Sequence, residues 1–259
     1  MNHRHPAGTF CWFELGTTDQ TSAKLFYGAL FGWGSDDTPM GDGASYTIFR
    51  MAGADVAAAF TLQDAMVKQG VTPNWLAYVA VDSVDDALAR ATALGGTVLQ
   101  AGFDVGDFGR MGTIQDPTGA VFAVWEARSH AGVGMTSGTG TAGWVELSSP
   151  DQERASNFYT ELFGWQMTAG KDHTPAVAGE YFHILHGGRL IGGMVPASHR
   201  DPATPPHWLV YFSVPDCERY TAKAVALGAR PLVDTMSIGA DGWVSVLADP
   251  QGAVFAVHQ

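Results

Sequence analysis

The sequence predicts a mixed α+β fold that contains two tandem copies of one domain. Residues 11–33 (CWFELGTTDQTSAKLFYGALFGW) align without a gap with residues 143–165 (GWVELSSPDQERASNFYTELFGW) and match at 12 of 23 positions. Near the other end of each copy, QDPTGAVFAVWE at 115–126 aligns with ADPQGAVFAVHQ at 248–259. The repeat therefore spans about half of the 259-residue chain, which is long enough for two domains with cores of their own.

The first part of each copy predicts a strand, then a helix, then further strands. Residues 12–15 alternate apolar and polar side chains as a half-buried strand does, and Asp19 follows as a helix N-cap. The next apolar residues recur at helical spacing, so they share one helix face: Ala23, Phe26, Tyr27 and Leu30. Residues 45–51 and 54–60 supply the later strands.

The second part of the first copy predicts the same order again. A strand at 75–81 leads through Ser83 and Asp86, a possible cap, into a helix over 84–94 that stops at Gly95 and Gly96. Strands at 96–103, 110–115 and 120–126 complete this part. The second copy repeats the pattern, with helices that begin near Asp151 and Asp216, the latter ending at Gly228. The chain thus consists of four βαβββ units, two in each copy.

A segment rich in glycine, serine and threonine separates the copies. Residues 128–143 (RSHAGVGMTSGTGTAG) lack periodic apolar residues and are typical of a flexible connector. We predict a first domain over 1–128, a linker over 129–142 and a second domain over 143–259.

Composition excludes several classes of partner. The formal charge of −12 argues against nucleic acid and against an anionic membrane, because both require a basic surface. No apolar run is long enough to span a bilayer, and the N-terminal residues lack the features of a secretory signal, so we expect a cytoplasmic protein. Cys11 and Cys217 stand at non-equivalent places, so we expect two buried thiols.

The motif D-x-x-x-A-x-x-FY-x-x-L-FGW after a first strand, together with DP-x-GAVFAV near the end, resembles the vicinal oxygen chelate superfamily of glyoxalases, bleomycin-resistance proteins and dioxygenases. The resemblance covers essentially the whole chain. More narrowly, the chain is similar to two-domain actinobacterial proteins described as glyoxalase-like. The resemblance implies two glyoxalase-like domains, each built from paired βαβββ units that curl around a cleft.

The metal ligands of that superfamily are missing from this sequence. The resemblance places them on the first, fifth and last strands of each domain, and each position holds a residue without a donor for a divalent ion. The first-strand positions are Trp12 and Trp144, the fifth-strand positions are Leu76 and Leu209, and the last-strand positions are Ala123 and Ala256. We therefore expect no metal ion and no cofactor.

Side chains at alternate positions of these strands predict the candidate site. Glu14 lies beside Trp12, and Glu146 beside Trp144, so each copy offers an indole next to a carboxylate, which suits a flat ligand that is polar or cationic. The copies differ at two further positions, where Asn74 and Trp125 correspond to His207 and His258. We predict ligand-binding roles for Trp12, Glu14, Trp125 and Trp144, and catalytic roles for Glu146, His207 and His258. A cluster of the last three could be an acid/base site or a relocated metal site.

Three functions remain open at this stage. The first is a metal-independent protein that binds a small aromatic molecule for sequestration, resistance or a specialised-metabolite pathway. The second is an enzyme, a glyoxalase-like lyase or isomerase acting on a carbonyl compound such as a methylglyoxal adduct, with Glu146 as the base and histidines assisting. The third is a regulatory or protein-interaction role. Because two domains share one chain, we expect a monomer whose partner is a small-molecule ligand.

Overall fold

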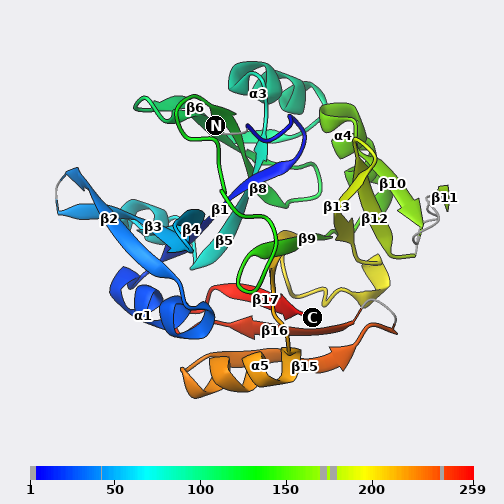
Figure 1. Cartoon of the computed structure of the whole chain (residues 1–259). Coiled ribbons are helices and arrows are strands. Elements are labelled where there is room, and N and C mark those ends of the chain that lie inside the picture. The colour runs from blue at the N-terminus through cyan, green and yellow to red at the C-terminus, as the bar shows by residue number, and fades with distance from the viewer. Residues whose placement is uncertain (1–3, 42, 170–173, 176–179, 240–241) are drawn as a thin grey trace. The chain divides into compact units, whose positions relative to one another are not determined.

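The computed structural model describes residues 4–41, 43–169, 174–175, 180–239 and 242–259. Within these residues it confirms the α+β class. One sheet has eight strands in the order β2-β3-β4-β1-β5-β8-β7-β6, and a second has nine in the order β11-β10-β12-β13-β9-β14-β17-β16-β15 (Figure 1). Each half of the sequence supplies one sheet, as expected from the repeat.

The first half of the chain contains eight strands and three helices among its described residues. The short helix α2 was not predicted. The elements are β1 Phe10–Thr17, α1 Gln20–Phe31, β2 Gly34–Gly41, β3 Ala44–Met51, β4 Ala54–Thr61, α2 Asp64–Lys68, β5 Asn74–Ala80, α3 Val84–Ala93, β6 Thr97–Val105, β7 Gly109–Gln115 and β8 Val121–Ala127.

The second half repeats the order of the first. Its described residues form β9 Ala142–Ser148, α4 Gln152–Phe163, β10 Gln166–Ala169, β11 Thr174–Pro175, β12 Phe182–His186, β13 Arg189–Met194, the 3-10 helix η1 Ala197–His199, β14 His207–Ser213, α5 Cys217–Ala226, β15 Arg230–Ser237, β16 Trp243–Ala248 and β17 Val254–His258. None of the helices among the described residues is both long and apolar enough to cross a bilayer.

The helices begin where the sequence predicts. The Asp19 carboxylate accepts a 2.9 Å hydrogen bond from the Ser22 amide at the start of α1. Asp151 and Asp216 do the same for α4 and α5, and each such cap contributes about 1 kcal/mol. Helix α1 ends at Gly32, whose φ of 78° is in the left-handed region that favours glycine. Local capping chemistry therefore fixes the helix ends.

Packing divides the chain into two units that each combine segments of both halves. Unit 1 contains Met1–Trp12, Ala77–Gly132 and Trp144–Trp208. Unit 2 contains Phe13–Leu76, Val133–Gly143 and Leu209–Gln259. Each unit therefore needs residues that are more than one hundred positions apart, and the sequence repeat does not coincide with the units of packing.

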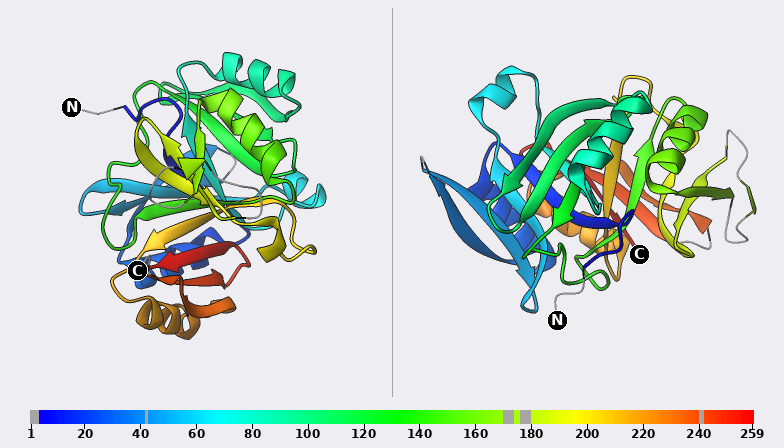
Figure 2. Two further views of the ribbon diagram at one scale, coloured as in Figure 1. Left: turned by 90° about the vertical axis from the view of Figure 1, so that its right-hand side faces the viewer. Right: turned by 90° about the horizontal axis from the view of Figure 1, so that it is seen from above.

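In unit 1, helices α3 and α4 lie side by side (Figure 2). The core of unit 1 contains a hydrogen-bonded triad of Tyr159, Asp116 and Trp208. The hydroxyl of Tyr159 donates to Asp116 at 2.9 Å and accepts from the indole of Trp208 at 2.9 Å. Asp116 also accepts hydrogen bonds from the amides of Thr118, Gly119 and Ala120. The Asp-Pro turn of the first half thus holds the first helix of the second half.

Unit 2 contains the matching triad. Tyr27 donates to Asp249 at 2.9 Å and accepts from the indole of Trp75 at 2.9 Å. Burial and the Asp249 carboxylate raise the pKa of Tyr27 well above its ordinary value, so the phenol stays protonated as a donor. A specific hydrogen bond thus joins a tyrosine on the first helix of one half to the Asp-Pro turn of the other half.

The connector is hydrogen-bonded to the protein on both sides. Residues 128–141, all of which the structure describes, form neither helix nor strand. In unit 1, the amides of Arg128 and His130 donate to the Phe108 carbonyl at 3.0 and 3.1 Å. In unit 2, the indole of Trp33 donates to the Gly140 carbonyl at 3.0 Å. The predicted boundaries of 1–128, 129–142 and 143–259 remain a prediction.

Candidate functional site

Four side chains of the second half form a polar and aromatic cluster within unit 1. We refer to Trp144, Glu146, Tyr181 and His183 as the Trp144 cluster. The hydroxyl of Tyr181 donates to Glu146 Oε2 at 2.8 Å, and the indole Nε1 of Trp144 donates to the Tyr181 hydroxyl at 3.0 Å. The His183 ring lies 5.2 Å from the Tyr181 ring and 6.0 Å from the Trp144 ring, between centroids. One tyrosine hydroxyl thus links the predicted Trp and Glu.

The alternation of strand β9 positions this cluster. Val145 and Leu147 are buried on one face of the strand, whereas Trp144 and Glu146 are half-buried on the other face. The partly exposed face is therefore the one that carries the predicted site residues. An indole and a carboxylate that are both reached by solvent can contact a ligand.

A glycine on the neighbouring strand makes room for the tyrosine. Glu146 pairs with Gly193 of β13 in parallel register. A Cβ atom at Gly193 would lie 2.1 Å from the Tyr181 hydroxyl, which is closer than Cβ contacts allow. Any side chain at position 193 would therefore displace Tyr181 from Glu146.

The first half repeats the Tyr–Glu bond in unit 2. The hydroxyl of Tyr46 donates to Glu14 Oε1 at 2.7 Å. Sequence reasoning missed both tyrosines. Tyr46 and Tyr181 are 135 positions apart, whereas Glu14 and Glu146 are 132 positions apart, so an ungapped comparison does not align them. An alignment of β3, which contains Tyr46, with the segment that leads from Tyr181 into β12 would have shown the repeated tyrosine.

The predicted binding residues Trp12 and Trp125 meet at a histidine of the connector. Within unit 1, the His130 ring packs edge-on against Trp12, with 4.6 Å between centroids, and lies 6.1 Å from Trp125. Trp12 is 5% exposed. The two predicted binding residues thus share one neighbour, His130, and a ligand-binding role for them remains a prediction.

The two predicted catalytic histidines bond to separate partners. The Nδ1 atom of His207 lies 2.8 Å from the Pro205 carbonyl oxygen, and the Nε2 atom of His258 lies 2.9 Å from Ser213 Oγ. Burial lowers the pKa of both histidines from the ordinary 6.5, and Arg200 lowers that of His207 further. Both rings are therefore neutral near pH 7. A catalytic role for them with Glu146 remains a prediction.

The donor set does not fit the metal ion that the resemblance implies. The last-strand positions Ala123 and Ala256 are buried and pair with Tyr78 and Tyr211. Trp, Leu and Ala at the three expected positions offer no ligand atom of the kind that a divalent ion needs. Across the part of the chain that is described, no group of three or more His, Cys, Asp or Glu residues could hold a metal ion. We therefore derive no chemistry through a metal.

The two cysteines offer no reactive centre. Cys11 and Cys217 are free and buried, as expected from the sequence. Burial raises the pKa of both thiols, so each stays protonated near neutral pH. A protonated, buried thiol is a poor nucleophile.

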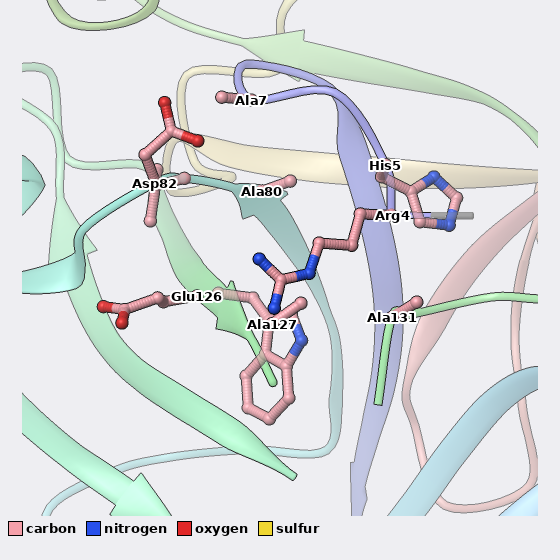
Figure 3. Close-up of a pocket in the computed structure, with 10 residues that line it drawn as sticks. Arg4, His5, Ala7, Ala80, Asp82, Glu126, Ala127 and Ala131 are labelled. Atoms are coloured by element: carbon pink, nitrogen blue, oxygen red, sulfur yellow. The ribbon is translucent and has the colours of Figure 1, made fainter. Parts of the chain in front are cut away.

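A small pocket opens in unit 1 beside the N-terminal segment (Figure 3). Its volume is about 70 Å³, and Figure 3 shows the Arg4 side chain reaching between His5 and the carboxylates of Asp82 and Glu126. Glu126 accepts a 3.0 Å hydrogen bond from the Val84 amide, which caps helix α3. Sites for drug-sized ligands measure roughly 300–1,000 Å³. This pocket is therefore too small for the ligand expected at the tryptophans.

Two family models match the chain, one in each half. Residues 12–125 match the glyoxalase-like domain, and residues 141–257 match the glyoxalase/bleomycin resistance protein/dioxygenase superfamily. The Mycobacterium tuberculosis protein named "Putative glyoxylase CFP32" is 38% identical over 96% of this chain and 94% of its own length. The anthracycline biosynthesis protein DnrV of Streptomyces peucetius is 31% identical over 98% of this chain and 94% of its own length.

Solved structures share the fold at low sequence identity. The Mn(II)-bound glyoxalase from Novosphingobium aromaticivorans superimposes with a TM-score of 0.64 at 16% identity, covering 97% of this chain and 82% of that one. The 2,3-dioxygenase LapB from Pseudomonas sp. KL28 gives 0.65 at 12% identity, covering 96% and 91%. With one matching domain in each half, the chain belongs to the glyoxalase/bleomycin resistance protein/dioxygenase superfamily.

Proposed function

We propose that this chain binds a small aromatic molecule at the Trp144 cluster, through side chains and without a metal ion. The observation that carries the proposal is the chain of hydrogen bonds from Trp144 through Tyr181 to Glu146. It fixes the indole and the carboxylate on the partly exposed face of β9. An oriented indole offers a stacking surface, and a carboxylate beside it attracts a ligand with a positive charge or a hydrogen-bond donor.

The charge of the chain and its relatives support the same ligand class. A formal charge of −12 raises the local concentration of cationic ligands. Two relatives are named for anthracycline biosynthesis, at 32% and 31% identity across 98% of this chain. An anthracycline is therefore the first probe to use. Sequestration, resistance or delivery within a specialised-metabolite pathway would each require binding alone.

The test is equilibrium dialysis of an anthracycline against the protein and three variants. Trp144→Ala removes the stacking surface and should lower affinity about tenfold, since aromatic contacts contribute roughly 0.5–1.5 kcal/mol beyond burial. Glu146→Gln keeps the shape but removes the charge, and should weaken a cationic ligand selectively. Trp243→Phe is the matched control, because Trp243 is 47% exposed on β16, outside the cluster. Equal affinity in all four proteins would refute the proposal.

A second candidate function is the glyoxalase-like lyase or isomerase activity. The observation that favours it is the 2.8 Å bond between Tyr181 and Glu146 beside the His183 ring, since a carboxylate base and a phenol can move a proton next to a carbonyl group. Turnover of a methylglyoxal adduct that disappears in Glu146→Gln, with affinity retained, would establish this alternative.

We further propose that the protein works as a monomer in the cytoplasm, without nucleic acid. The presence of two domains in one chain supports a monomer, and the acidic charge argues against binding to nucleic acid. Light scattering coupled to size exclusion would measure one chain mass for a monomer and twice that mass for a dimer. A regulatory role would instead give a protein partner in pull-downs and no bound small molecule.

A further inference from the structure

The two copies of the tryptophan site differ in what covers the indole. Trp144 of the second half is half-buried, whereas Trp12 is 5% exposed. The group against Trp12 is the imidazole of His130, edge-on at an interplanar angle of 84°. His130 comes from the segment that follows β8, and not from the strands that carry the site. A residue of the connector thus contacts the indole where a ligand of the first copy would bind.

Several bonds hold this histidine in place. The indole Nε1 of Trp125 donates to the His130 carbonyl at 3.0 Å, and the His130 amide donates to the Phe108 carbonyl at 3.1 Å. The neighbouring Ser129 donates to the Asp107 carbonyl through both its amide and its hydroxyl, at 3.2 and 2.8 Å. The backbone of this segment is therefore anchored independently of the imidazole, and loss of the ring alone should leave it in position.

A glycine lets the segment approach β1 closely. Gly132 has a φ of 114°, and a Cβ atom there would lie 2.2 Å from the Cys11 carbonyl oxygen. Only glycine combines that backbone conformation with that approach. The segment therefore passes close to β1, and the imidazole of His130 lies 4.6 Å from the Trp12 ring and 6.1 Å from the Trp125 ring, between centroids.

We propose that Trp12 and Trp125 form a second ring-binding site, for a small aromatic ring of about the size of an imidazole, and that His130 fills it from within the chain. The edge of an imidazole carries positive character and packs well against the negative face of an indole. Of these two tryptophan sites, the Trp144 cluster then remains open to an external ligand. This inference extends the proposed function to the first half, but its test does not depend on a ligand at the Trp144 cluster.

The test uses fluorine NMR of protein labelled with 5-fluorotryptophan. The chain has eight tryptophans, and the variants Trp12→Phe and Trp144→Phe assign the two signals of interest. Exchange of H₂O for D₂O shifts the signal of a solvent-exposed indole. In the unsubstituted protein, Trp144 should show this shift and Trp12 should not.

Removal of the imidazole should open the site. In His130→Ala the Trp12 signal should gain the solvent shift, and added imidazole should reverse it in a saturable way. Imidazole should leave the Trp12 signal of the unsubstituted protein unchanged. The matched control is His183→Ala, which removes the imidazole against Trp144 and should alter only the Trp144 signal. His130→Asn, which keeps a polar side chain but no ring, serves as a second variant.

Three results would overturn the inference: a solvent shift of Trp12 in the unsubstituted protein, a protected Trp12 in the folded His130 variants, or a Trp12 signal in those variants that does not respond to imidazole. Each is distinct from failure of the proposed function, which would appear as absence of ligand binding at Trp144 in the unsubstituted protein.

Discussion

The hydroxyl of Tyr27 donates a 2.9 Å hydrogen bond to the carboxylate of Asp249, although the two residues are 222 positions apart. Tyr159 and Asp116 repeat this bond with the halves exchanged. In each case a helix near the start of one half is tied to the Asp-Pro turn near the end of the other half. The duplicated motifs of the sequence are therefore each other's partners within units 2 and 1.

Removal of either tyrosine hydroxyl should destabilise the fold. Tyr27→Phe and Tyr159→Phe each leave a buried aspartate and a buried indole N–H with one partner fewer, which costs about 1–3 kcal/mol. Chemical denaturation measures this loss. Tyr220→Phe is the control, because Tyr220 is only half-buried on α5. A change below about 0.5 kcal/mol in both core variants, within the range of ordinary surface substitutions, would show that the triads are not stabilising.

The contribution of Asp249 to stability should fall as the pH rises from 3.8 through the raised pKa of its carboxyl. Burial raises the pKa of this carboxyl above the usual 3.8, in opposition to its hydrogen bonds. Between 3.8 and the raised value the folded protein holds the proton and the unfolded chain does not, so raising the pH favours unfolding. Asp249→Asn should flatten this part of the profile of unfolding free energy against pH. An unchanged slope would contradict the assignment.

Titration of His258 should make the free energy of unfolding depend on pH in the opposite direction, at pH values below 6.5. Burial lowers the pKa of His258 below 6.5, so the unfolded chain takes up a proton before the folded protein does as the pH falls. The stabilising contribution is therefore complete above pH 6.5 and is lost on acidification through the lowered pKa. His258→Gln should reduce the slope of unfolding free energy below pH 6.5, measured by urea denaturation. A steeper slope in the variant would be inconsistent with a neutral, buried ring.

Substitutions at Gly193 and Tyr181 should weaken ligand binding through the same contact, the hydrogen bond from Tyr181 to Glu146. Tyr181→Phe removes the hydrogen bond to Glu146 and should weaken ligand binding about two- to tenfold, the range for one net hydrogen bond. Gly193→Ala should weaken binding at least as much, because its Cβ would collide with the Tyr181 hydroxyl. The double variant should bind no worse than Gly193→Ala alone in equilibrium dialysis. Additive losses would mean that position 193 affects the site by another route.

The helices and the face of the first strands could be predicted from the sequence because their signals are local. Asp19 caps α1 as expected, and the alternation in β9 places Trp144 and Glu146 together on a half-buried face. Strand β2 (Gly34–Gly41) was not assigned, because all its residues are exposed and none of them creates an apolar pattern. A strand held mainly by backbone pairing leaves little trace in side-chain periodicity.

Tyr181 and His130 could not be identified as site residues from the sequence pattern around them. Tyr181 contacts Glu146 from 35 positions away, and a shift in the repeat conceals its equivalence with Tyr46. His130 lies in a segment whose composition indicates only a connector. Its contact with Trp12 depends on the path of the backbone between Phe108 and Gly132, which tertiary structure determines. The catalytic roles predicted for Glu146, His207 and His258 depend on a substrate and remain predictions.

The most direct test of the central claim is a fluorine NMR titration of 5-fluorotryptophan-labelled protein with a panel of aromatic compounds that includes an anthracycline. We predict a saturable change of the Trp144 signal with at least one compound, an unchanged Trp12 signal, and an affinity for that compound about two- to tenfold weaker in Tyr181→Phe. Compounds that bind while leaving the Trp144 signal unchanged, or the absence of any saturable change across the panel, would contradict it.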